Sequence, residues 1–111
     1  MSYSEKSLEE IITTLCEKIV ANVNPLRIVL FGQAVTLSSE SVETLNLLLI
    51  MPNETHRRKT AQDLRKSLGF VGMPFDIIVA TTEDIEKYGE EPAMIYSSIL
   101  KEGREIYNNS K

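Results

Sequence analysis

The chain has 111 residues, of which 42% are hydrophobic and 25% charged, so we expect a single domain, residues 1–111, that buries one core. Its formal net charge of −4 argues against nucleic acid or an anionic membrane as partner, because both favour a basic surface. One cysteine excludes an internal disulfide bond, and the longest apolar run, residues 47–51, is too short to span a membrane. Charged residues near the N-terminus argue against a signal peptide, so a cytoplasmic protein is predicted.

Residues 5–22 form the clearest predicted helix. Ser7 and Glu10 have the spacing of a capping box, and Ser4 is an alternative cap. Cys16 lies within the apolar stripe, which predicts a core residue and not a reactive thiol. The stripe repeats at the spacing of one helix face: Leu8, Ile11, Ile12, Leu15, Cys16, Ile19, Val20 and Val23.

Two strands are predicted next. Residues 26–31 are apolar on both faces, which is typical of a buried strand, and Gly32 ends it. A short helix over residues 33–37 and a polar loop over residues 38–41 lead to a second strand, residues 44–51.

The second half of the chain repeats the alternation of helix and strand. A helix over residues 54–68 is followed by a strand at residues 75–79. Thr81 and Asp84 are spaced as an N-cap pair, which predicts a short helix to residue 89. The last helix is predicted to begin at Glu91-Pro92, with proline at its first position and with Ala93, Tyr96, Ile99 and Leu100 on one face. This pattern predicts an α/β fold, an α+β sandwich with a three-stranded mixed sheet and four to five helices that cover mainly one face.

The order of these pieces resembles the minimal nucleotidyltransferases of the DNA polymerase β-like superfamily. In that family a strand ends in Gly-Ser, a second strand begins with Asp-x-Asp, and a later strand carries a third aspartate. Here Gly32 follows the first strand, Asp76 begins the third, and residues 96–107 are similar to the family's closing helix and extended segment. The resemblance implies a nucleotidyltransferase-like fold over nearly the whole chain.

The same resemblance implies a degenerate active site. Active members hold Mg²⁺ and a nucleoside triphosphate with their three aspartates, because Mg²⁺ prefers carboxylate oxygens. In this chain Gly32 and Asp76 match the family, but Gln33 replaces the serine, and Thr44 and Asn46 replace the paired aspartates. No residue is therefore assigned a catalytic role, and no cofactor is expected. Asp76 is the one metal ligand that could remain.

One dense basic run, His56-Arg57-Arg58-Lys59, opens the second long helix. Arg57, Arg58 and Lys59 are candidates for binding a phosphate or an acidic partner, and the alternative is an ordinary solvated helix face. His56 is the one histidine, which excludes histidine-based metal clusters and catalytic triads built from this chain.

The main hypothesis is a catalytically inactive nucleotidyltransferase-like protein that binds another protein. The resemblance implies a helical partner of the HEPN type, in some cases a ribonuclease toxin for which such a domain is the antitoxin. A homo-oligomer is also open, because a small sheet leaves edges uncovered. Two alternatives remain: a domain that binds Mg²⁺ and a nucleoside triphosphate through Asp76 with weak activity, and a small α/β scaffold of unrelated role.

Overall fold

A four-stranded mixed sheet lies at the centre of the computed structural model, which describes residues 7–109. The strand order is β3-β2-β1-β4, and five α-helices with one 3-10 turn, η2 (Ser39–Ser41), complete the described residues. The strands are β1 (Arg27–Phe31), β2 (Leu45–Met51), β3 (Phe75–Thr81) and β4 (Arg104–Asn108). The helices are α1 (Leu8–Val23), α2 (Gln33–Thr36), α3 (Arg57–Leu68), α4 (Thr82–Tyr88) and α5 (Ile95–Glu102).

The sheet has one strand more than the sequence predicts. β4 pairs antiparallel with β1, and β1 pairs antiparallel with β2 on its other side. β2 and β3 form the one parallel pair among these strands, with α3 as the crossover between them. The expected three-stranded sheet was wrong because β4 contains only two large apolar residues, Ile106 and Tyr107, and is recognisable as a strand mainly through its pairing with β1.

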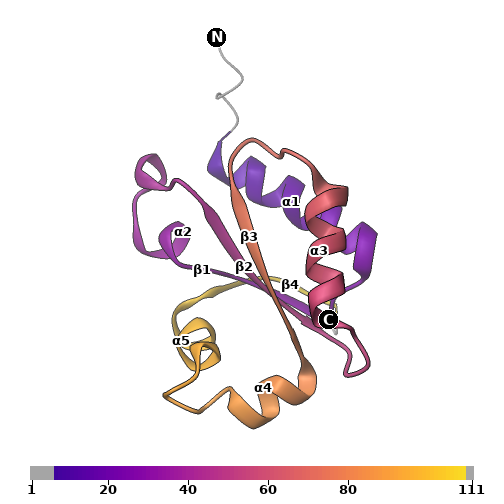
Figure 1. Cartoon of the computed structure of the whole chain (residues 1–111). Helices are drawn as coiled ribbons and strands as arrows, with labels where there is room; N and C mark the ends of the chain where they lie inside the picture. Colours follow the sequence, from indigo (N-terminus) through magenta and orange to yellow (C-terminus); the bar gives the residue numbers. More distant parts are fainter. Residues whose placement is uncertain (1–6, 110–111) are drawn as a thin grey trace.

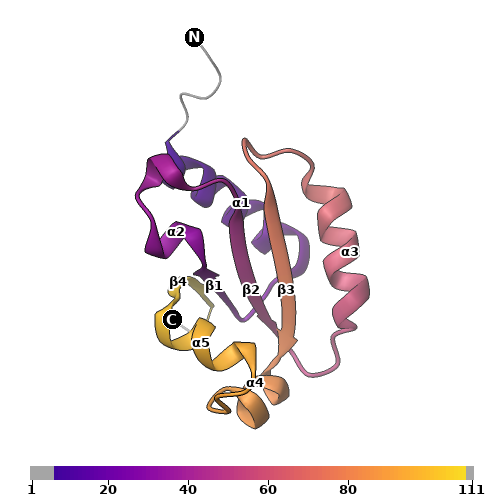
Figure 2. The same ribbon diagram turned by 60° about the vertical axis from the view of Figure 1, so that its left-hand side comes forward.

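Helices cover both faces of the sheet, which corrects the expectation of one covered face. Figure 1 and Figure 2 show α1 and α3 on one side and α4 and α5 on the other. Leu47 and Leu49 of β2 point into the larger core beneath α1 and α3, whereas Leu48 and Ile50 point into a smaller core with Ile99 of α5. The continuous apolar run of β2 is therefore explained by burial on both faces.

The capping box predicted at the start of α1 is confirmed. The Ser7 hydroxyl accepts a hydrogen bond from the Glu10 N–H (3.1 Å), and the Ser7 N–H donates to the Glu10 carboxylate (2.8 Å). Ser4 and the predicted helix start at residue 5 lie outside the described residues. Cys16 is half-buried and packs against the larger core, as expected, and burial raises the pKa of its thiol.

Three predicted boundaries within the described residues move by two or more residues. α3 begins at Arg57 instead of residue 54, because His56 acts as its N-cap. α5 begins at Ile95, so Pro92 precedes the helix and Ala93 is exposed in the turn. β3 continues to Thr81, which caps α4 through the predicted pair with Asp84. Within residues 7–109, no helix is both long and apolar enough to cross a membrane.

Candidate functional site

Gly32, Asn46 and Asp76 come together at one end of the sheet. Asn46 on β2 pairs with Phe31, the residue before Gly32, and on its other side with Asp76 on β3. Gly32 has a φ of 79°, and a Cβ atom added to it would lie 2.8 Å from Nδ2 of Asn46. The glycine turn therefore lies directly against Asn46, the position that matches the second metal aspartate of the family that the sequence resembles.

Gln33 and Thr44 hold the backbone around this cluster. The Gln33 side-chain oxygen Oε1 accepts hydrogen bonds from the N–H groups of Glu43 (2.8 Å) and Thr44 (3.3 Å). The Thr44 hydroxyl donates to the carbonyl oxygen of Pro74 (3.4 Å), just before β3. Gln33 thus ties the start of α2 to the segment that enters β2, where a serine would be too short to reach in the same way.

Asp76 is engaged by an arginine that the sequence analysis did not assign to the site. Its Oδ1 accepts hydrogen bonds from Nη2 of Arg65 (3.0 Å) and from the N–H of Ile77 (2.9 Å). The same Arg65 nitrogen donates to the carbonyl oxygen of Ile77 (3.1 Å). The Asp76 side chain is 63% exposed, so its charge is balanced by the guanidinium and by solvent together.

The donor set around Gly32 is poorly suited to a divalent cation. Thr44 and Asn46 contribute a hydroxyl and an amide, and Asp76 is paired with Arg65. Within residues 7–109, no group of three or more histidine, cysteine or acidic side chains is placed to share a metal ion. Mg²⁺ against a triphosphate calls for several carboxylate oxygens, so these residues fit hydrogen bonding better than metal binding.

No family model matches the chain, and neither a curated protein nor a solved structure with significant similarity to it was found. The resemblance to the minimal nucleotidyltransferases therefore depends on the residues quoted above and on the order of the elements.

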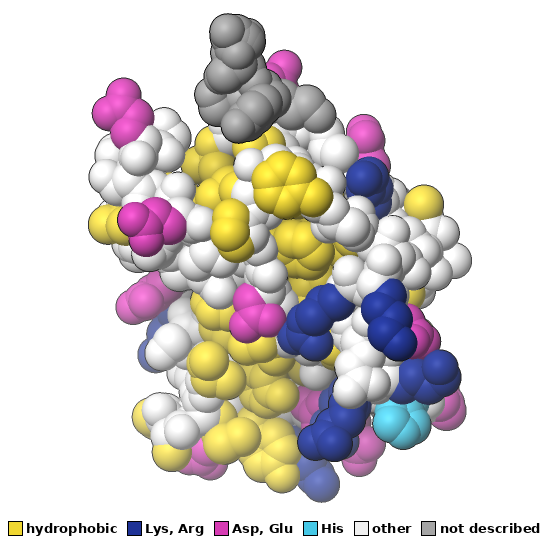
Figure 3. Space-filling view, turned by 45° about the horizontal axis from the view of Figure 1, so that its top comes forward, with side chains coloured by type: hydrophobic (Ala, Val, Ile, Leu, Met, Phe, Trp, Pro, Cys, Tyr) yellow, Lys and Arg dark blue, Asp and Glu magenta, His cyan; other side chains and the backbone are white. Residues whose placement is uncertain are grey.

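The basic run on α3 is partly neutralised by neighbouring carboxylates. Nη1 of Arg57 lies 2.6 Å from Oδ2 of Asp84, and the Lys59 ammonium lies 3.1 Å from Asp63 one turn along the helix. Arg58 is exposed. Figure 3 shows the basic side chains gathered around the histidine, beside a strip of hydrophobic side chains. Two of the three phosphate-binding candidates, Arg57 and Lys59, thus have acidic partners within the chain.

Replacing Asp84 with asparagine is expected to lower the free energy of unfolding by roughly 1 kcal/mol near neutral pH, because the carboxylate that caps α4 and pairs with Arg57 is lost. Burial raises the pKa of Asp84, but the Thr81 N–H and the Arg57 guanidinium lower it by more, so the folded pKa is below that of the unfolded chain. The stability from this group is present above the unfolded pKa, about 3.9, and is lost as the pH falls through the folded value.

Urea unfolding of Asp84→Asn and of the wild type between pH 7 and pH 2.5 measures the difference in their free energy of unfolding. This difference should shrink toward zero in acid. Glu83→Gln is the matched control, because Glu83 lies in the same helical turn and its carboxylate forms no ion pair among the described residues. An equal loss in both variants would show that the Arg57 contact contributes nothing.

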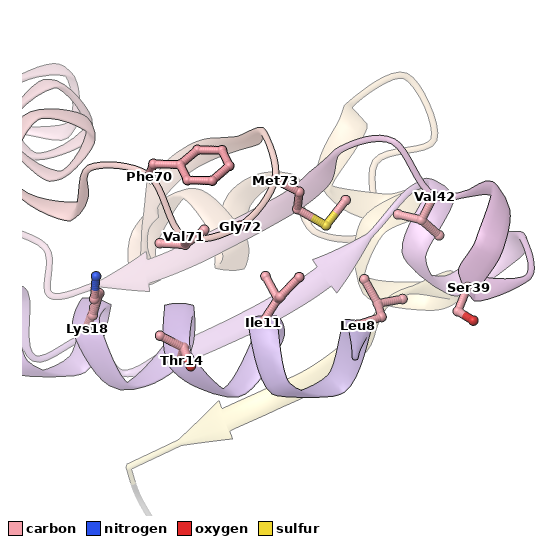
Figure 4. A pocket seen from close by; sticks show the side chains of 10 residues that line it. All are labelled: Leu8, Ile11, Thr14, Lys18, Ser39, Val42, Phe70, Val71, Gly72 and Met73. Atoms are coloured by element: carbon pink, nitrogen blue, oxygen red, sulfur yellow. The ribbon is translucent and has the colours of Figure 1, made fainter. Parts of the chain in front are cut away.

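An apolar groove lies between α1 and the loop from α3 to β3. It has a volume of about 660 Å³, and Figure 4 shows side chains of both segments facing one another across it. Phe70, at one side of the groove, is 78% exposed. The hydrophobic residues that line it are Leu8, Ile11, Val42, Phe70, Val71 and Met73, and Thr14, Lys18, Ser39 and Gly72 complete the lining. This groove was not predicted, because it is formed by segments distant in the sequence.

Proposed function

We propose that the chain is a catalytically inactive protein of nucleotidyltransferase-like fold whose role is to bind another protein. The observation that carries the first part is the pairing of Asp76, the one family-matching carboxylate, with Arg65. Nη2 of Arg65 lies 3.0 Å from Oδ1 of Asp76, where a metal ion would have to approach this oxygen. The side chains of Thr44 and Asn46 are neutral.

The apolar groove supports the second part. An aromatic ring that is 78% exposed beside a groove lined with leucine, isoleucine and methionine is the kind of surface that a partner side chain fills. The partner we propose is a helical protein of the HEPN type, as the family resemblance implies. An apolar helix face fits such a groove, since its side chains at successive turns insert between the walls.

The test of binding is the affinity of the full chain for a HEPN-type protein from the same cells, measured by calorimetry with Phe70→Ser. We expect the variant to bind about 30-fold more weakly, since truncating a buried aromatic anchor costs about 2 kcal/mol. Tyr88→Ser is the control, because Tyr88 is a half-exposed aromatic residue on α4, outside the groove. Unchanged affinity in Phe70→Ser would show that the groove is not the interface.

The same proposal predicts no heat of binding when Mg²⁺-ATP is titrated into the wild type or into Asp76→Ala. Micromolar binding that disappears in Asp76→Ala would contradict it and would support the alternative, a nucleotide-binding domain with weak activity. The two measurements are independent, because Asp76 does not line the groove and its hydrogen bonds go to Arg65 and Ile77.

A further inference from the structure

β3 forms one edge of the sheet, so half of its backbone groups point away from β2. The carbonyl oxygen of Pro74 points toward β2, where it accepts a hydrogen bond from the Leu45 N–H. The Thr81 N–H points the other way and donates to the Asp84 side chain, outside the sheet. Because backbone groups of a strand alternate in direction, Phe75, Ile77, Val79 and Thr81 present theirs to the outside. An edge of this kind is a template for another strand.

The outward groups of Ile77, in the middle of this edge, are both occupied by side chains. Asp76 accepts the hydrogen bond of the Ile77 N–H at 2.9 Å, and Arg65 donates to the Ile77 carbonyl oxygen at 3.1 Å. Arg65 and Asp76 also bind each other at 3.0 Å, which closes a ring around one peptide position. We call these two side chains the edge clamp.

The clamp stands where a second copy of the chain would pair. Two β3 edges aligned antiparallel about Ile77 would place Phe75 of one copy opposite Val79 of the other, so the pairing is self-complementary. In that arrangement the two Ile77 residues must exchange both of their N–H···O bonds. The clamp takes both groups, whereas Thr81 at the far end is already held by Asp84.

We propose that Arg65 and Asp76 keep β3 from pairing with β3 of a second copy, and that this is the role of the ion pair. The clamp is well suited to such a role, because its two charged groups lie at the edge and would have to be displaced together. This inference uses the same Asp76–Arg65 pair as the proposed loss of metal binding, but it does not depend on partner binding, since it concerns the backbone of β3 and not the groove.

The test compares Arg65→Met with Lys66→Met by sedimentation over a range of protein concentrations. Both variants remove one exposed positive charge from α3, but among the described residues it is Arg65 and not Lys66 that donates a hydrogen bond to Ile77. We expect Arg65→Met to self-associate with a Kd about tenfold lower than that of the wild type. In each copy the substitution frees the Ile77 carbonyl oxygen and removes the guanidinium that holds the Asp76 carboxylate, and each copy contributes about a factor of three. Lys66→Met should match the wild type.

Hydrogen exchange then locates the contact. In Arg65→Met the segment that contains Ile77 should gain protection as concentration rises, and Asp76→Ala should behave in the same way, since it frees the Ile77 N–H. Equal association of Arg65→Met and Lys66→Met would overturn the proposal. So would new protection at β4 instead of β3, or a wild-type dimer already paired through β3. Circular dichroism of each variant checks that an associating sample is folded.

Discussion

Gly103→Ala is expected to lower the free energy of unfolding by about 3 kcal/mol, because the added methyl group has no space. Gly103 joins α5 to β4, and a Cβ atom there would lie 2.5 Å from the carbonyl oxygen of Ile99 and 2.6 Å from Cγ1 of Val29. The Leu30 carbonyl oxygen would lie at 2.9 Å. Two of these neighbours are backbone atoms of α5 and β1, so relief of the clash requires the backbone at the junction of α5 and β4 to shift.

Urea unfolding measures the loss, and hydrogen exchange over residues 104–108 reports whether β4 detaches. Gly69→Ala is the control, because nothing lies within 4 Å of its added Cβ and only its positive φ of 63° opposes the change. That variant should lose about 1 kcal/mol. If both variants lose the same amount, contact with β1 is not the reason for glycine at position 103.

Gly32→Ala is expected to cost about 2 kcal/mol, since its backbone conformation is one that residues with a side chain rarely adopt. Gly32 has a φ of 79° and a ψ of −140°, and the new methyl group would also meet the Asn46 amide at 2.8 Å. Thermal or urea unfolding of the variant measures the total loss in free energy of unfolding from the backbone strain and the contact with Asn46.

The double variant Gly32→Ala with Asn46→Ala separates the two causes. Removing the amide relieves the contact but leaves the backbone strain, so the double variant should recover only part of the loss relative to Asn46→Ala alone. Full recovery would assign the whole cost to the contact with Asn46, and no recovery would assign it to the backbone.

The sequence predicts the elements whose signal is local. The apolar period of α1, its Ser7–Glu10 cap and the buried runs of β1 and β2 each depend on residues a few positions apart, and the structure confirms them. The Thr81–Asp84 cap is a further case. The grouping of Gly32, Asn46 and Asp76 was expected from the family resemblance alone, and the pairing of β2 with β1 and β3 places them at one end of the sheet.

The features that sequence reasoning missed depend on contacts between distant segments. β4 is identified by hydrogen bonds to β1, and its residues have no strong alternation of their own. In the sequence, Arg65 is one more charged residue of a basic helix, and no neighbouring residue indicates that its side chain reaches Asp76 on β3. The start of α5 was misplaced because Pro92 is compatible with a first helical position as well as with the turn it occupies.

The pairing of β1 with β4 sets an order for folding during synthesis. β1 lies inside the sheet, yet one of its two neighbours is made from residues 104–108, and the Asn109 N–H binds the Leu26 carbonyl oxygen at 3.0 Å. One side of β1 therefore stays without its strand partner while the ribosome adds the residues between them. The hairpin of β1 and β2 can form early, whereas closure across so long a stretch of chain is slow. A nascent chain halted before residue 104 would present β1 as an open edge, which is a site for a chaperone or for misassembly.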